Sequence, residues 1–109
     1  MNSHQLIDER SLAFDRLIAK KLKADPALVE RAKANIERWL EATSPRSRPA
    51  LLEWKKILEK PIDDICDQLL AFDENAKRLR QSSPFAGMLT QAERTAILRD
   101  YQDRESDAA

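Results

Sequence analysis

The sequence predicts an all-α protein, a compact bundle of five to six short helices. Apolar residues recur at three- and four-residue spacings along most of the chain, as they do on the buried face of a helix. The chain has only one glycine and five prolines, whereas the many turns of a β-sandwich or barrel need glycine at positive φ. The length of 109 residues indicates a single domain over residues 1–109, since chains usually divide only beyond roughly 250 residues.

Two long helices are predicted in the N-terminal half. The first covers Leu6 to Leu22, where the apolar residues form one stripe. Asp25 and Pro26 separate it from the second, because Asp caps free backbone N–H groups and Pro fits the first position of a helix. The second helix therefore begins at Pro26 and runs to about Ala42. Its apolar face consists of Leu28, Val29, Ala32, Ile36, Trp39 and Leu40.

Prolines divide the middle of the chain. Residues 43–49 contain two prolines among Ser and Thr residues and are predicted to form a surface linker. A short third helix begins at Leu51 and ends near Lys60, because the residue before a proline disfavours the helical backbone. Pro61 then opens a fourth helix with Cys66 on its apolar face. Burial of that thiol is expected.

The last third of the chain carries the clearest helix start signals. Asp73 is a predicted cap for a fifth helix over 74–81, and residues 82–89 form a loop. Thr90 and Glu93 match the capping box, in which each side chain accepts a hydrogen bond from the other residue's backbone N–H. The last helix follows to about Gln102. Residues 103–109 lack an apolar anchor, and we expect them to fray.

The residue types indicate a protein that is not an enzyme. The only histidine, His4, lies close to the N-terminus, so we expect no histidine base beside a nucleophilic side chain. Cys66 is the only cysteine, which excludes an internal disulfide and a CxxC metal or redox pair. A phosphate-binding loop needs several glycines, and the chain has one. We therefore expect no catalytic residue, no metal site and no cofactor.

The sequence also predicts a cytoplasmic protein that does not enter a membrane. The first residues lack the basic and apolar regions of a signal peptide. No apolar run approaches the roughly 18 residues needed to span a bilayer.

Charge leaves nucleic-acid binding open as an alternative function. Residues 1–60 hold 13 Lys and Arg against 9 Asp and Glu, a net +4, whereas residues 61–109 carry a net −4. A DNA-binding regulator would use the second helix, with Lys33, Asn35 and Arg38 reaching the bases. Three glutamates on the same helix would repel phosphates. This alternative is therefore less favoured than a protein partner.

The loop over residues 82–89 is the most informative segment. A chain that uses glycine once is expected to use it where φ must be positive, and that residue is Gly87. The apolar side chains beside it either plug the core or anchor a partner. A polar and cationic stretch precedes the loop. The candidate partner-binding residues are Arg78, Arg80, Gln81, Phe85, Gly87 and Met88.

Several stretches resemble a group of small bacterial helical proteins that are similar to the antitoxin partners of toxin–antitoxin gene pairs. These stretches are residues 9–13, residues 21–28, the segment around Trp54 and residues 79–87, of which residues 80–87 are the most specific. The resemblance implies a binding protein that neutralises a toxin enzyme by covering its active site or substrate groove. It implies no catalytic residue.

Overall fold

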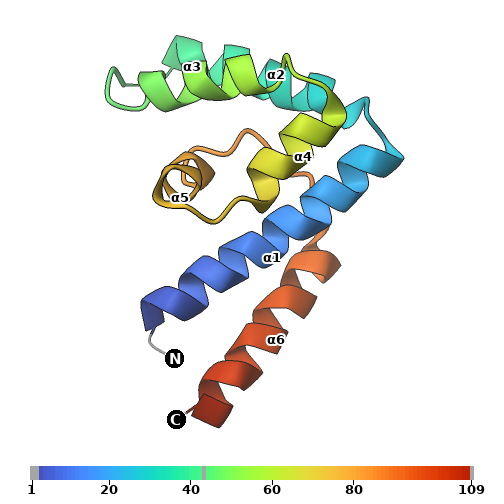
Figure 1. The fold of residues 1–109 in the computed structure, drawn as a ribbon, viewed down its shortest axis with the longest axis vertical. Helices are drawn as coiled ribbons and strands as arrows, with labels where there is room; N and C mark the ends of the chain where they lie inside the picture. The colour runs from blue at the N-terminus through green and yellow to red at the C-terminus, as the bar shows by residue number, and fades with distance from the viewer. Residues whose placement is uncertain (1–2, 43, 109) are drawn as a thin grey trace.

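The computed structural model describes residues 3–42 and 44–108. This part of the chain forms six helices joined by turns and loops, and it contains no strand (Figure 1). The all-α fold is therefore confirmed. The helices are α1 (Ser3–Ala24), α2 (Leu28–Ala42), α3 (Arg48–Ile57), α4 (Ile62–Leu70), α5 (Glu74–Arg80) and α6 (Gln91–Ala108).

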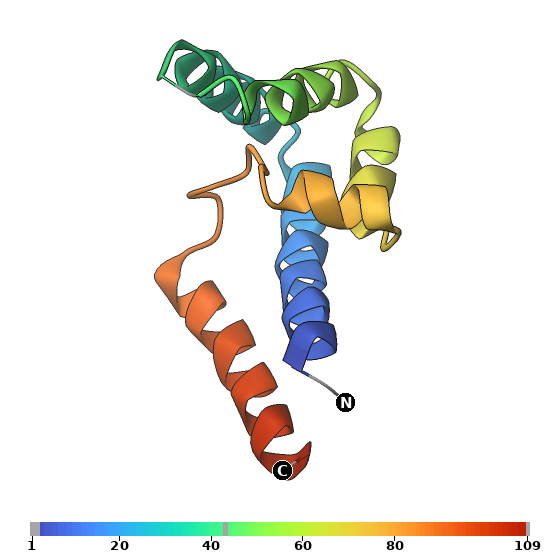
Figure 2. The ribbon, with the colours of Figure 1, turned by 90° about the vertical axis from the view of Figure 1, so that its left-hand side faces the viewer.

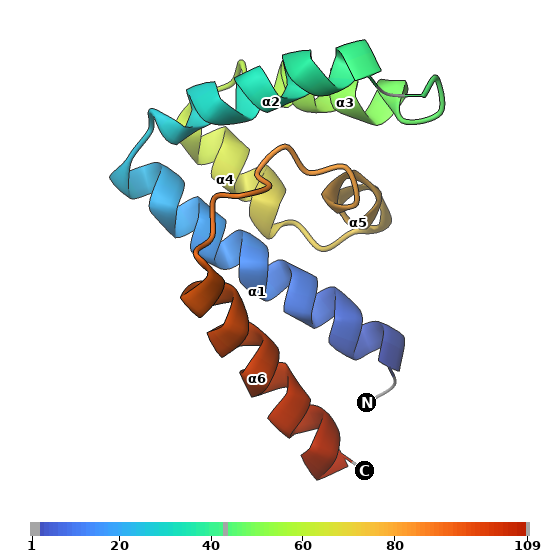
Figure 3. The same ribbon diagram turned by 180° about the vertical axis from the view of Figure 1, so that it is seen from behind.

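The helices are arranged around α1. Figures 1 and 3 show α2 and α3 side by side at one end of the molecule, with α4 packed on α1 beneath them. Helix α6 returns along α1, and Figure 2 shows these two helices extending beyond the α2–α3 pair. The Cα radius of gyration is 14.6 Å, larger than the roughly 13 Å of a compact 100-residue domain. The extended α1–α6 pair explains the difference.

The core lies where α1, α2, α3 and α4 meet the segment that follows α5. Trp54 is 2% exposed, and its indole N–H donates a hydrogen bond of 2.8 Å to the carbonyl of Leu79. Cys66 is buried as expected, with its Sγ 3.6 Å from the carbonyl oxygen of Ala19. The largest fully buried aliphatic side chains are Leu22, Ile36, Leu58, Ile65, Leu69 and Leu79.

Two of the predicted helix caps are confirmed by hydrogen bonds. The Asp73 carboxylate accepts a bond of 2.7 Å from the backbone N–H of Ala76 at the start of α5. Thr90 and Glu93 form the reciprocal capping box before α6: the Thr90 hydroxyl accepts at 3.1 Å, and the Glu93 carboxylate accepts at 2.8 Å. These short-range signals therefore fix where α5 and α6 begin.

Two predicted boundaries around the prolines were wrong. Helix α2 begins at Leu28 rather than Pro26, although Asp25 still accepts a hydrogen bond of 3.2 Å from the N–H of Ala27. Helix α3 begins at Arg48, so the linker ends before it; residue 43 lies outside the described residues. Pro49 lies in the first turn of α3, where its missing N–H costs no hydrogen bond.

The predicted end of the last helix near Gln102 was also wrong. Helix α6 continues to Ala108, and residue 109 lies outside the described part of the chain. No glycine or proline interrupts residues 103–108, and Ala, Arg and Glu are good helix formers. A helix can therefore extend past the last apolar residue when nothing breaks its backbone hydrogen bonds.

Lys21 holds the start of α6 against α1. Its Nζ donates hydrogen bonds of 2.5 Å to Glu93 Oε1 and 2.9 Å to the carbonyl of Met88. The hydrogen bond from Lys21, with further bonds from Thr90, lowers the pKa of the Glu93 carboxyl. The folded state therefore favours the charged carboxylate, so this contribution to stability is full above the ordinary pKa of Glu. It is lost as the pH falls through the lowered value.

We expect Glu93→Gln to flatten the pH dependence of unfolding at acidic pH. Wild type loses the Glu93 contribution as the pH falls below the ordinary pKa of Glu, whereas the variant has no carboxyl at that position to titrate. Urea unfolding of both proteins at several pH values measures the difference. Parallel curves for the two proteins would show that the carboxyl of Glu93 has the same pKa folded and unfolded.

Candidate functional site

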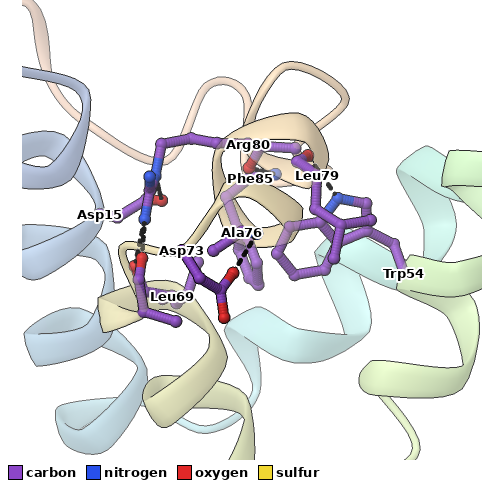
Figure 4. Close-up of polar contacts among 10 residues, drawn as sticks. Asp15, Trp54, Leu69, Asp73, Ala76, Leu79, Arg80 and Phe85 are labelled. Carbon is purple, nitrogen blue, oxygen red and sulfur yellow. Dashed lines mark hydrogen bonds and ion pairs between the residues drawn. The ribbon is translucent and has the colours of Figure 1, made fainter. Parts of the chain in front are cut away.

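A buried ion pair joins α5 to α1 at the centre of the candidate site. Arg80 Nε donates a hydrogen bond of 2.6 Å to Asp15 Oδ2, and the two side chains are 9% and 6% exposed. The same guanidinium donates bonds of 3.0 Å and 2.7 Å to the carbonyls of Leu69 and Ala71 at the end of α4. Figure 4 shows Arg80 reaching from α5 toward Asp15 and Leu69. Arg80 therefore ties three helices together and satisfies carbonyls that the end of α4 leaves free.

The electrostatics of this pair are those of a structural contact. Burial raises the pKa of the Asp15 carboxyl, and the hydrogen bond and positive charge of Arg80 oppose that effect. A carboxylate taken out of water without a cation would be costly. Arg80 is thus required to keep Asp15 charged inside the protein.

Phe85 and Met88 are part of the core, which settles the choice between a plug and a partner anchor. Phe85 is 2% exposed, and its ring packs edge-on against Trp54 with centroids 5.9 Å apart. The Met88 side chain is buried too. The expectation that these two side chains contact a partner was therefore wrong, because the fold buries them.

Gly87 has φ +82°, the positive value expected of the chain's only glycine. A Cβ built on Gly87 would meet no atom within 4 Å, so only the backbone conformation favours glycine here. We expect Gly87→Ala to cost about 1–2 kcal/mol of unfolding free energy. Gly87→Asn should cost less, because Asn tolerates positive φ. Equal stability of all three proteins in chemical denaturation would contradict this.

An open groove lies along α1 beside this segment. One pocket of about 230 Å³ lies between α1, residues 80–89 and the start of α6. A second, of about 160 Å³, shares Ser11, Arg80 and Gln81 with it. We call the two together the α1 groove. Its α1 lining consists of Ile7, Asp8, Ser11, Phe14, Asp15 and Ile18.

The α1 groove combines apolar surface with positive charge. Ile7 is 48% exposed, and the guanidinium of Arg94 lies over the ring of Phe14 at 5.1 Å. Lys77 lines the far end and lies 3.4 Å from the Asp8 carboxylate. Ile7 and Phe14 are seven residues apart and share one helix face. Such a surface suits apolar side chains flanked by a carboxylate.

The sequence does not single out the α1 groove, because Ile7 and Phe14 belong to the apolar stripe that predicts the buried face of the helix. Of the six predicted partner-binding residues, Arg80, Gln81, Phe85 and Gly87 line the groove, with Phe85 buried beneath it. Gln81 and Gly87 are exposed there. The signal that could have revealed the groove is the width of the stripe on α1, which exceeds what one packed neighbour covers.

Arg78 lies outside the α1 groove and already has a partner. Its two terminal nitrogens donate hydrogen bonds of 2.8 Å and 3.0 Å to the two carboxylate oxygens of Glu53 on α3. This bidentate pair raises the pKa of the guanidinium and lowers the pKa of Glu53. The structure thus separates Arg78 from the other candidates, and its role in partner binding stays a prediction.

The three nucleic-acid candidates on α2 make contacts within the chain. Asn35 Nδ2 donates a hydrogen bond of 2.9 Å to the carbonyl of Pro84, which fastens the 82–89 loop to α2. Arg38 donates to the Asn35 side-chain oxygen at 2.5 Å. Lys33 lies 3.5 Å from a carboxylate one turn earlier. Asn35 therefore acts as a support for the loop rather than as a free group on the surface.

No site for a metal is formed in the described ranges: no three His, Cys, Asp or Glu side chains there lie close enough together to hold an ion. None of the described helices combines the length and apolar character needed to cross a membrane. No protein-family model matches the chain, and neither does any curated protein or solved structure.

Proposed function

We propose that this protein is a non-catalytic, cytoplasmic interaction domain of the antitoxin type. It neutralises a partner toxin enzyme by binding it at the α1 groove. The observation that carries the proposal is the groove itself, where exposed Ile7 and half-buried Phe14 lie beside the cations of Lys77 and Arg94. Aromatic and arginine side chains are the groups that most often dominate binding energy at protein interfaces.

The resemblance to antitoxin-like proteins and the groove involve the same segment. Residues 80–87 carry the most specific part of that resemblance. Six of them line the first pocket: Arg80, Gln81, Ser83, Phe85, Ala86 and Gly87. A segment fixed from beneath by buried Phe85 presents its outer atoms in one conformation. Such preorganisation favours tight binding, because less conformational entropy is lost on association.

The groups that could act as acids or bases near the groove are engaged within the fold. Asp15 is paired with Arg80, Asp8 lies near Lys77, and Glu93 is bonded to Lys21. General acid–base catalysis needs a group that is free to reach a substrate proton. These internal pairs favour a steric mechanism, in which the domain covers the functional surface of its partner.

Co-expression of this chain with the product of its neighbouring gene tests the proposal. We expect the neighbour to arrest growth alone, growth to recover when both are expressed, and the two proteins to elute as one complex. Failure to rescue growth and to form a complex would contradict the antitoxin function. Substrate turnover by the pure protein that one acidic substitution abolishes would contradict the non-catalytic part.

A further inference from the structure

The face of α1 opposite the α1 groove carries three exposed cations. Arg16, Lys20 and Lys23 are spaced i, i+4 and i+7, which places them within an arc of about 60° on the helix. At about 100° per residue, the centre of that arc lies about 160° from Ile7 and Phe14. None of the three cations forms an ion pair with another described residue. We call this surface the cationic face.

The cations surround an apolar hollow. A shallow pocket of about 400 Å³ is lined by Arg16, Ala19, Lys20, Lys23 and Leu70, where Leu70 ends α4. Leu70 is 41% exposed, whereas Leu69, the other leucine of α4, is buried. The hollow thus joins an uncovered leucine to three unpaired positive charges.

We propose that the cationic face binds an acidic amphipathic helix of a partner protein. Carboxylates spaced i, i+4 and i+7 on such a helix would face Arg16, Lys20 and Lys23, because both helices have the same rise and turn. A leucine or methionine on the same face would cover Leu70. The proposal concerns a second surface and does not depend on what the α1 groove binds.

A protein helix matches this face better than nucleic acid does. Asp63 and Asp67 are exposed on α4 seven and three residues before Leu70, so they share the helix face of Leu70 at the edge of the hollow. Fixed carboxylates at the edge repel a phosphate backbone. A protein helix avoids that repulsion by placing a lysine at the same edge, and its apolar residues can cover the hollow.

The test uses a fluorescein-labelled helical peptide with Glu at i, i+4 and i+7, one Leu on the same face and Lys on the α4 side. Fluorescence anisotropy with the full chain measures its affinity. We expect binding that weakens at least tenfold when Arg16, Lys20 and Lys23 are all changed to Glu. A matching peptide with Lys in place of the three Glu residues should then bind the changed protein better than wild type.

A control changes three exposed cations elsewhere, Arg31, Lys56 and Lys60, to Glu, and we expect affinity to stay within about twofold. The single variants Lys20→Glu and Leu70→Ser keep the test decisive if the triple variant does not fold. Each should weaken binding about two- to fivefold. Ile7→Asp, in the α1 groove, should leave this binding unchanged, so the result is independent of the proposed function.

Two outcomes would overturn the proposal. One is equal affinity for a peptide with Gln in place of Glu, which would show that charge complementarity contributes nothing. The other is a 20-base-pair DNA duplex, or vesicles rich in phosphatidylserine, binding this face more tightly than the acidic peptide does and losing affinity in the triple variant.

Discussion

Phe85→Ala is expected to lower the free energy of unfolding by about 3–5 kcal/mol, the usual cost of truncating a buried aromatic residue. Phe85 is 2% exposed and packs edge-on against Trp54, so truncation leaves a cavity and removes a favourable ring contact. A loss of this size should lower Tm by at least about 12 °C in a domain of this length. Thermal unfolding followed by circular dichroism measures it.

Two control variants test whether the loss of stability comes from the burial of Phe85 rather than from removing an aromatic ring. Phe85→Leu should recover most of the stability, because it restores most of the apolar volume. Phe72→Ala removes a ring that is 41% exposed and lies under Lys77, so Tm should change much less. A Phe85→Ala protein that unfolds at the wild-type temperature would show that Phe85 does not plug the core.

Arg80→Ala is expected to cost about 3–5 kcal/mol, the effect of removing one partner from a buried ion pair. The variant leaves Asp15 buried without its cation, and it also frees the carbonyls of Leu69 and Ala71. Denaturant unfolding at neutral pH measures the loss. Arg78→Ala, which breaks a pair at the surface, is the matched control and should change stability little.

The loss of unfolding free energy caused by Arg80→Ala should become smaller as the pH falls. Without Arg80, burial raises the pKa of Asp15 in the folded protein further above its unfolded value. A raised carboxyl pKa makes the folded state bind a proton more tightly, so stability increases on acidification through that value. Asp15→Asn should likewise rescue part of the loss. A loss of stability that neither acid nor Asp15→Asn reduces would show that the lost packing of Arg80, rather than the buried, unpaired charge of Asp15, causes it.

The starts of α5 and α6 were predictable because their signals are local. Asp73 and the Thr90–Glu93 capping box each satisfy backbone groups within three residues, so the sequence contains both partners of each hydrogen bond. The start of α3 was missed because Pro49 both ends and begins helices. Apolar periodicity does not predict the end of α6, because the helix continues past its last apolar anchor where no glycine or proline breaks the backbone.

The candidate site was less predictable because it depends on contacts between distant parts of the chain. Gly87 could be assigned a positive φ from its being the only glycine. The pairing of Arg80 with Asp15, 65 residues earlier, follows only from the packing of α5 beside α1 and α4. The face of α1 that lines the groove is also fixed by where α6 and the 82–89 loop lie. Periodicity locates the stripe but does not show how much of it stays uncovered.

The partner affinity of two matched variants tests most directly whether the α1 groove is the binding surface. Ile7→Asp places a charge in the groove, and Leu52→Asp places one at a similarly exposed leucine on α3, outside it. Calorimetric titration with the neighbouring gene product should show at least thirtyfold weaker binding for Ile7→Asp, which corresponds to about 2 kcal/mol. Leu52→Asp should stay within about threefold of wild type, a difference of less than 1 kcal/mol. Equal affinities of the two folded variants would contradict binding at the α1 groove.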